Sequence, residues 1–355
     1  MSRRRLFAVS MLLATMAGAA AAAESVDGAL SRYAFSEPHM GTQARIVVYM
    51  QGETQARRAA DAGFARIRQL DAVLSDYRSD SELSRLCARA GQGPVHVGAD
   101  LFAVLQAAQS LAERSDGAFD VSRGAVTRIW RQARKLDERP DPARLRQALA
   151  TGNYRDLRLD PDARTVTLAR PGIELDVGGI AKGYAAEQAL EEMRNAGAQR
   201  ALVALGGDIV VGAPPPGEAG WRIDVAPLDV PGAPSGTTLL LKHSAVSTAG
   251  DAEQWMEIDG VRHSHVLDAR TGWPLAFRST TTVVAPHGLQ ADGLDTAASV
   301  LGAEAGFRLL AGVPGSAALM VRQDPDGQVR HLASKGWPSP VSAPDNVTAS
   351  LETSR

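Results

Sequence analysis

Apolar residues recur at three- and four-residue spacing along the first third of the chain. Between Gln55 and Leu74 they would share one face of an amphipathic helix, which predicts a long helix there. A second, short helix is predicted after Asp80 or Ser81 as N-cap, and a third at about 100–114. The positions predicted to be buried on the first helix are Ala56, Ala60, Phe64, Ile67, Leu70 and Leu74.

Beyond residue 157, short β-branched or alternating runs bounded by glycine, proline and aspartate predict strands. Helices are predicted from about Ala181, over 290–301 and over 307–310, and 34–50 reads as a strand around Ile46. Strands mixed with helices indicate an α+β fold rather than a bundle or a sandwich. The predicted strands beyond 157 are 164–169, 172–178, 200–212, 220–226, 236–251, 261–268 and 279–286.

Composition indicates a globular protein with no broad attraction to polyanions. The 355 residues are 45% hydrophobic and 22% charged, with a formal net charge of -2, so neither nucleic acid nor an anionic membrane is an expected partner. The polar stretch 132–152, with Pro140 and Pro142, predicts a loop and a short helix and is the weak candidate for an internal boundary. Residues 336–355 are predicted to form a flexible tail.

The N-terminus has the layout of a secretory signal peptide. Three arginines precede a short apolar stretch and a run of small residues, so 1–23 is predicted to be a signal peptide and 24–335 the main domain of an exported protein. The arginines suit either a Sec or a twin-arginine signal. The apolar stretch is too short for a comfortable membrane span, so no transmembrane segment is expected in the mature chain. The single cysteine, Cys87, lies too far along the chain for N-terminal lipid attachment.

The stretch LDVGGIAKG, residues 175–183, is the first candidate for chemistry. Two glycines before a helix let backbone approach a ligand, and Lys182 beside the helix N-terminus suits a phosphate group. The pattern matches neither Walker A nor the dinucleotide G-x-G-x-x-G motif. A purely structural glycine turn is the alternative.

Two further stretches carry groups that bind metals or move protons. In ADGLDTAA, Asp292, Asp295 and Thr296 share one helix face, and their oxygens are the ligand type that Mg²⁺ takes; the alternative is that Asp292 only caps the helix. In HSHVLDARTGWP, His263 and His265 would face the same way on a strand and could pair as ligands, or one could act as a base.

Taken together and in this order, the motifs resemble those of the FAD:protein FMN transferases, once called thiamine-biosynthesis lipoproteins. The resemblance covers about Tyr33 to His331. The quoted stretches are MGT at Met40, LDAVLSDYRSDSELSRL, GAFDVS, LDVGGIAKGYA, LVALGGDIVVG, AVSTAGD, HSHVLDARTGWP and ADGLDTAASVLG.

The resemblance implies a two-lobed α+β fold with the flavin in the cleft between the lobes. It also implies an enzyme that uses FAD and Mg²⁺, transfers FMN to a threonine hydroxyl of an exported or membrane redox protein as a phosphoester, and releases AMP. By resemblance, the metal is held by the backbone oxygen of Gly179 with Asp292, Asp295 and Thr296. His265 would take the threonine proton, and Lys182 would approach the pyrophosphate. The residues implied to line the flavin or adenosine half are Met40, Tyr77, Ala118, Phe119, Asp120, Asp176 and Val266.

Two positions depart from the family pattern: Ala249 stands where a serine is frequent, and Ala269 where a proline is frequent. Ala249 lacks a hydroxyl that could contact the flavin, and Ala269 makes its turn less rigid. Both changes are expected to affect how the flavin fits and not the reaction itself, because neither residue belongs to the predicted metal site. Two other activities use the same pocket. One is a flavin carrier that holds FAD without turnover, and the other is hydrolysis of FAD to FMN and AMP with water as nucleophile.

Overall fold

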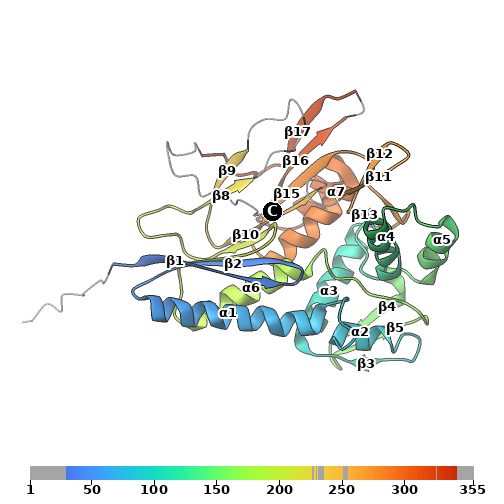
Figure 1. Cartoon of the computed structure of the whole chain (residues 1–355), viewed down its shortest axis with the longest axis horizontal. Helices are drawn as coiled ribbons and strands as arrows, with labels where there is room; N and C mark the ends of the chain where they lie inside the picture. Colours follow the sequence, from blue (N-terminus) through green and yellow to red (C-terminus); the bar gives the residue numbers. More distant parts are fainter. Residues whose placement is uncertain are drawn as a thin grey trace, which may run out of the picture.

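The computed structural model describes residues 29–225, 228, 230, 236–250, 255–324 and 326–341 (Figure 1). The predicted signal peptide and most of the predicted tail therefore lie outside the described residues, as does Asp251 of the AVSTAGD motif. Within the described part of the chain, no helix combines the length and hydropathy needed to cross a bilayer.

The centre of the molecule is an eight-stranded antiparallel sheet. Its order is β1-β2-β6-β7-β10-β15-β16-β17, so strands from both ends of the chain form one layer. The strands are β1 (Ser31–His39), β2 (Thr42–Met50), β6 (Ala201–Leu205), β7 (Asp208–Val211), β10 (Ser244–Gly250), β15 (Ser279–Ala285), β16 (Ala317–Gln323) and β17 (Val329–Ala333).

Three helices pack on one face of this sheet: α1 (Glu53–Leu74), α6 (Ala181–Asn195) and α7 (Gly288–Ala311). In Figure 1, α1 and α6 lie side by side below the β1–β2 pair, and α7 lies next to β15. The other face is covered by the hairpin of β8 (Trp221–Val225) and β9 (Thr237–Leu241), which buries apolar side chains against β2, β7, β10 and β15. The central strands of the sheet are therefore covered on both faces.

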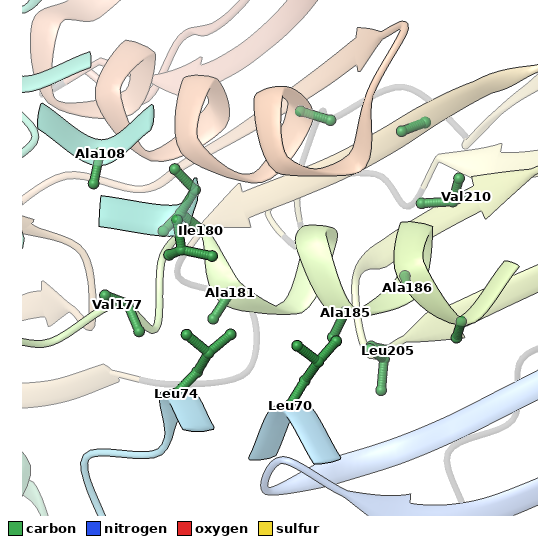
Figure 2. Close-up of a cluster of buried hydrophobic side chains, with 14 of the residues drawn as sticks. Leu70, Leu74, Ala108, Val177, Ile180, Ala181, Ala185, Ala186, Leu205 and Val210 are labelled. Atoms are coloured by element: carbon green, nitrogen blue, oxygen red, sulfur yellow. The ribbon is translucent and has the colours of Figure 1, made fainter. Parts of the chain in front are cut away.

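The core between α1, α6 and the sheet is made of the residues that the sequence pattern selects. Leu70 and Leu74 of α1 point toward Ala181 and Ala185 of α6 (Figure 2). All six positions predicted to be buried on the first helix are buried, because the 3.6-residue period keeps them on one face. Ile180, just before α6, enters the same core.

A second group of elements flanks this layered body on the side of α4 and α5 in Figure 1. One continuous apolar core joins the small three-stranded sheet of this group to the main body. The remaining elements are α2 (Glu82–Cys87), β3 (Val95–His96), α3 (Ala99–Arg114), α4 (Gly124–Leu136), α5 (Pro142–Thr151), η1 (Tyr154–Asp156), β4 (Leu157–Asp160), β5 (Thr165–Leu168), β11 (Trp255–Ile258), β12 (Val261–Ser264), β13 (Leu267–Asp268) and β14 (Trp273–Pro274).

Several predictions of secondary structure were wrong. The single strands predicted at 200–212 and 236–251 are each two strands, β6 with β7 and β9 with β10. Residues 34–50 form not one strand but the β1–β2 hairpin, which turns at Met40 and Gly41, both at positive φ. The predicted strand 172–178 is irregular, because its backbone groups bond to Val121, Gly124 and the Cys87 sulfur rather than to a strand. Residues 124–136 form α4, which the abundance of polar residues concealed. The break predicted between the helices at 290–301 and 307–310 is confirmed, because the backbone of Gly302 within α7 is not helical (φ 74°, ψ 176°) and separates two helical segments.

Candidate functional site

The first two turns of α7 carry the residues predicted to hold a metal. Asp292 and Asp295 are 3% and 2% exposed, and Thr296 is half-buried. Asp292 does not cap this helix, because the N-cap is His287. The predicted i, i+3, i+4 arrangement is therefore present, on the part of α7 that packs against α6 and β10.

Each buried carboxylate is held by hydrogen bonds from other elements. Asp292 Oδ2 accepts the backbone N–H of Gly183 in the first turn of α6 at 2.9 Å. The hydroxyl oxygen of Ser247, on β10, lies 2.6 Å from Asp295 Oδ2 and 2.5 Å from Asp208 Oδ1 on β7. Asp208 is also ion-paired with Lys182. Side chains from α6, α7, β7 and β10 thus form one polar cluster.

Charges in this cluster act strongly on one another because little water reaches them. Burial, together with the charge of Asp208, raises the pKa of Asp292 to about 7. Burial and the neighbouring Asp292 raise the pKa of Asp295 well above its usual range. Burial alone would lower the pKa of Lys182, but Asp208 and Asp292 raise it. Asp292 and Asp295 therefore ionise fully only when a further positive charge compensates them, which a bound cation would supply.

The glycine turn before α6 lies against the same part of α7. A Cβ placed on Gly179 would come 3.3 Å from Thr296 Oγ1 and 3.4 Å from the Phe119 ring. One turn later, a Cβ on Gly183 would come 2.1 Å from the carbonyl oxygen of Gly288, so α6 and α7 touch backbone to backbone. The glycines are needed for this close approach.

The predicted metal ligands have the chemistry that Mg²⁺ requires. Two carboxylates, one hydroxyl and the nearby backbone of Gly179 offer hard oxygen donors from two adjoining segments. Among the described residues, no group of three or more His, Cys, Asp or Glu side chains is arranged to hold a metal ion. The predicted set contains only two such side chains, so it fits a Mg²⁺ that keeps several oxygens from water or from a phosphate ligand.

Lys182 has a different partner from the one predicted. Its ammonium contacts the carboxylate of Asp208, and about 33% of its side chain is exposed. The helix N-terminus is also partly occupied, because Asp292 already accepts the N–H of Gly183. The site thus holds its own anion at the place where an incoming phosphate was expected, and a contact of Lys182 with the pyrophosphate stays a prediction.

Tyr77 and Asp176 are brought together by Arg131 of α4. The guanidinium contacts the carboxylate of Asp76, donates to Asp176 Oδ2 at 2.9 Å and lies 4.6 Å from the centre of the Tyr77 ring. Tyr77 is 77% exposed. Its ring is therefore available to a ligand while its loop is fixed.

The segment Ala118–Asp120 is buried beside the glycine turn. The Phe119 ring faces Gly179, whereas the Asp120 carboxylate turns inward. It accepts hydrogen bonds from Ser122, both backbone and hydroxyl, and from the backbone N–H of Tyr154. Phe119 is thus placed to contact a ligand at Gly179, and Asp120 orders the turn that carries it.

His265 follows β12 and is half-buried. The residues on either side anchor it, because the Ser264 N–H donates to Leu275 and the Val266 carbonyl accepts from Leu275. The Val266 side chain packs in a cluster that includes Ala249 of β10 and Val300 of α7. His263 lies elsewhere: its ring stacks on Trp130 at 6.3 Å, and burial lowers its pKa.

Met40 lies in the β1–β2 turn, next to the turn that leads into Asp208. A Cβ on Gly206 would come 3.1 Å from Thr42 Oγ1, and one on Gly207 would come 3.3 Å from the carbonyl oxygen of Thr248. The turns at Met40–Gly41 and Gly206–Gly207 and the end of β10 therefore gather at one end of the sheet.

Asp208, Ser247 and Arg131 were missed in the sequence. For Asp208 a signal existed, because an acidic residue is unusual at the start of an apolar strand, directly after two glycines. Ser247 lies inside a quoted motif but carries no distinguishing spacing, and Arg131 belongs to a helix that was not predicted.

Comparison with known proteins identifies relatives of this chain. The FAD:protein FMN transferase of Treponema pallidum (strain Nichols) is 33% identical over 316 residues, which cover 85% of this chain and 87% of that protein. A protein of the same name from Klebsiella pneumoniae (strain 342) is 30% identical over 295 residues, covering 83% and 87%.

Solved structures with a similar fold are also flavin transferases. The apo form of flavinyl transferase ApbE from Pseudomonas stutzeri superimposes with a TM-score of 0.74 at 30% identity, covering 86% of this chain and 96% of that one. Flavin transferase ApbE from Vibrio cholerae gives 0.76 at 26% identity, covering 86% and 98%. The predicted mixed helix-and-sheet fold is thereby confirmed. The ApbE family profile matches residues 40–320, and the chain belongs to this family.

Proposed function

We propose that this chain is an FAD:protein FMN transferase that modifies a threonine of a target protein. The observation that carries the proposal is the buried cluster of Asp292, Asp295 and Asp208 against the glycine turn, in a chain whose curated relatives bear that name. In the reaction, the threonine oxygen bonds to the phosphorus of the FMN half while the bond from that phosphorus to the oxygen of AMP breaks. AMP leaves, and the threonine proton passes to the enzyme.

The metal would be held by the side chains of Asp292, Asp295 and Thr296 and by the backbone oxygen of Gly179. When bound, Mg²⁺ neutralises charge on the pyrophosphate and favours departure of AMP. The protein contributes by holding the oxygen atoms of these proposed ligands in place. Ser247 and the Gly183 N–H hold the two carboxylates, and Lys182, which is paired with Asp208, supplies a nearby positive charge.

His265 would accept the proton of the attacking threonine. An imidazole suits this step because its ordinary pKa is near neutrality. The support is positional: Val266, the next residue, packs with residues of β10 and α7 that lie near Ser247 and Thr296 in the sequence. Around the flavin, we propose contacts from Met40, Tyr77, the segment Ala118–Asp120, Asp176 and Val266.

We further propose that residues 24–335 act as one catalytic domain in the periplasm, after removal of the signal 1–23. The target would be an exported or membrane redox protein with an accessible threonine. Either export route fits this proposal. Substitution of the signal arginines, followed by fractionation, distinguishes twin-arginine export from Sec export.

The test is covalent labelling of an acceptor domain that bears a flavinylation threonine. Mature protein, FAD and Mg²⁺ are incubated with it, and bound flavin is read by in-gel fluorescence and mass. A mass gain matching FMN with release of AMP, lost without Mg²⁺ or in Asp292→Asn, is expected. Asp259→Asn, the same change at an exposed ion pair, serves as the control.

Two outcomes would assign a different activity. FAD binding without AMP or labelling would make the chain a flavin carrier. AMP and FMN released in water, with no label on any acceptor threonine, would make it a hydrolase.

A further inference from the structure

Arg131 contacts two segments of the candidate site that lie far apart in the sequence. One nitrogen contacts Asp76 and the other donates to Asp176 Oδ2 at 2.9 Å. The three side chains are only 12–24% exposed. Burial and the charge of Asp176 raise the pKa of Asp76, so the two carboxylates repel each other and depend on the guanidinium between them.

Each carboxylate leads directly to a residue placed at the site. Asp76 precedes Tyr77, whose exposed ring lies under the same guanidinium at 4.6 Å. Asp176 uses its second oxygen to accept the N–H of Gly178 at 2.8 Å, which shapes the turn that presents Gly179. A planar guanidinium is suited to this because it donates in two directions at once, whereas an ammonium is a point charge.

The helix that carries Arg131 is itself fixed against these segments. The N–H of Gly124, at the start of α4, donates to the carbonyl of Glu174, and a Cβ on Gly124 would come 2.8 Å from that oxygen. The indole N–H of Trp130 donates to the carbonyl of Gly272 at 2.8 Å, in the turn that follows His265. Arg131 therefore projects from a rigid base rather than from a mobile loop.

We propose that Arg131 is a positioning residue that holds the Tyr77 loop and the Gly178–Gly179 turn at the relative positions needed to bind FAD and Mg²⁺. It acts through Asp76 and Asp176 and bonds to neither ligand. This inference rests on the proposed function, since Tyr77 and Gly179 are the groups assigned there to the flavin nucleotide and the metal. Its consequence is that a single substitution on α4 weakens both binding events together.

The test compares Arg131→Gln with Arg128→Gln. Arg128 is on the same helix and is paired at 2.6 Å with Glu174, two residues before Asp176, but it is 69% exposed and its partner does not bond to the glycine turn. FAD binding is measured by quenching of flavin fluorescence, without any acceptor. The Mg²⁺ requirement is the concentration that gives half-maximal labelling, and folding is monitored by thermal melting.

Arg131→Gln is expected to raise both half-saturation concentrations, on the order of 10- to 100-fold as for other groups that orient ligands indirectly. The maximal rate at saturating FAD and Mg²⁺ should change less, and Arg128→Gln should resemble the wild type. Equal shifts in both variants, or unchanged FAD and Mg²⁺ requirements in a folded Arg131→Gln protein, would overturn the proposal. So would full recovery by Arg131→Lys, because the proposal requires the two separate donor nitrogens of a planar guanidinium.

Failure of the proposed function gives a separate result. A wild-type protein that binds FAD but labels no acceptor would refute the transferase reaction. The fluorescence comparison of the two variants would still decide whether Arg131 positions the FAD site.

Discussion

Individual side chains in this molecule bridge elements that are distant in sequence. Asp100 of α3 is a clear case. Its carboxylate accepts a hydrogen bond at 3.0 Å from the Arg66 guanidinium of α1 and another at 2.8 Å from the Tyr184 hydroxyl of α6. Burial by itself would raise the pKa of Asp100, but these hydrogen bonds lower it. The ionised form is therefore the one that stabilises the junction of the three helices.

Asp100→Asn is expected to destabilise the protein at pH 7 by about 1 kcal/mol, since the pair is partly exposed. A carboxyl with a lowered folded-state pKa adds stability above its ordinary value of 3.8, and this is lost as pH falls through the lowered value. Urea unfolding at pH 7 and pH 3 measures the difference. If the difference in the free energy of unfolding between the wild type and Asp100→Asn stayed constant down to pH 3, this account would be contradicted.

Cys87 should be unreactive in the folded protein. Burial raises the pKa of its thiol to about 11, and its sulfur accepts the N–H of Leu175 at 3.2 Å. At pH 8 only about one thiol in a thousand would be ionised. Alkylation followed by mass should therefore be slow at pH 8, faster at pH 10 and complete in denaturant. Rapid labelling of the native protein at pH 8 would show that the thiol is accessible and ionised.

Local spacing decided which site residues the sequence could identify. Asp292, Asp295 and Thr296 are neighbours on one helix, so their arrangement follows from the helical period alone. Their partners could not be found in this way: Ser247 is 48 residues from Asp295, and Asp208 is 26 residues from Lys182. Such pairings depend on the order of strands in the sheet, which no local pattern encodes.

Among the elements, the contact between α6 and α7 is the one on which the candidate site depends most directly. Gly183 and Gly288 allow the two backbones to touch, and this brings the Gly183 N–H within 2.9 Å of Asp292. The same pairing sets Gly179 beside Thr296. The distance between the helices is thus also the width of the proposed metal site.

Gly183→Ala is expected to force these helices apart, because the added Cβ would lie 2.1 Å from a backbone oxygen that cannot rotate away. We expect a loss of about 3 kcal/mol or more in the free energy of unfolding, with loss of FAD binding. Gly52→Ala is the control, since a Cβ there meets open space at negative φ. Equal stability of the two variants in urea would show that the helices can separate without cost.

Two of the helices show what the sequence could and could not predict. Helix α1 follows from its buried stripe. In α4, Val126, Trp130 and Ala133 also recur at four- and three-residue spacing and are buried, so a periodic signal existed; the many cationic residues between them made the stretch look like a polar loop. The strand-like run 172–178 has β-type composition, but its backbone partners lie in loops, so tertiary contacts override its propensity.

For the whole molecule, the buried acidic cluster makes stability depend on a cation. Carboxylates of Asp208, Asp292 and Asp295 lie around Lys182, and their mutual repulsion opposes folding until a metal compensates it. Binding to the folded state alone then adds stability by mass action, about 2.7 kcal/mol at a concentration 100-fold above Kd.

Mg²⁺ should therefore raise the Tm of the wild type, and a chelator should reverse the rise. Asp295→Asn should remove the Mg²⁺ response while leaving the metal-free protein at least as stable as the wild type, because a buried carboxyl that must ionise to bind the ion is replaced by a neutral amide. Thermal melting with and without Mg²⁺ measures both effects, with Asp259→Asn as control. A full Mg²⁺ response in Asp295→Asn would place the ion elsewhere.

The order of strands also has a consequence for synthesis. Strand β2 pairs with β6, so the β1–β2 hairpin is complete once residue 50 has emerged, yet its neighbour is residues 201–205. All of α1 to α5 is made in that interval. The growing chain therefore displays an open row of backbone donors and acceptors along β2 until residues 201–205 have been made, and such a row is a template for intermolecular pairing. Factors that hold nascent chains should matter most for this protein until the α6–β6 segment has been made.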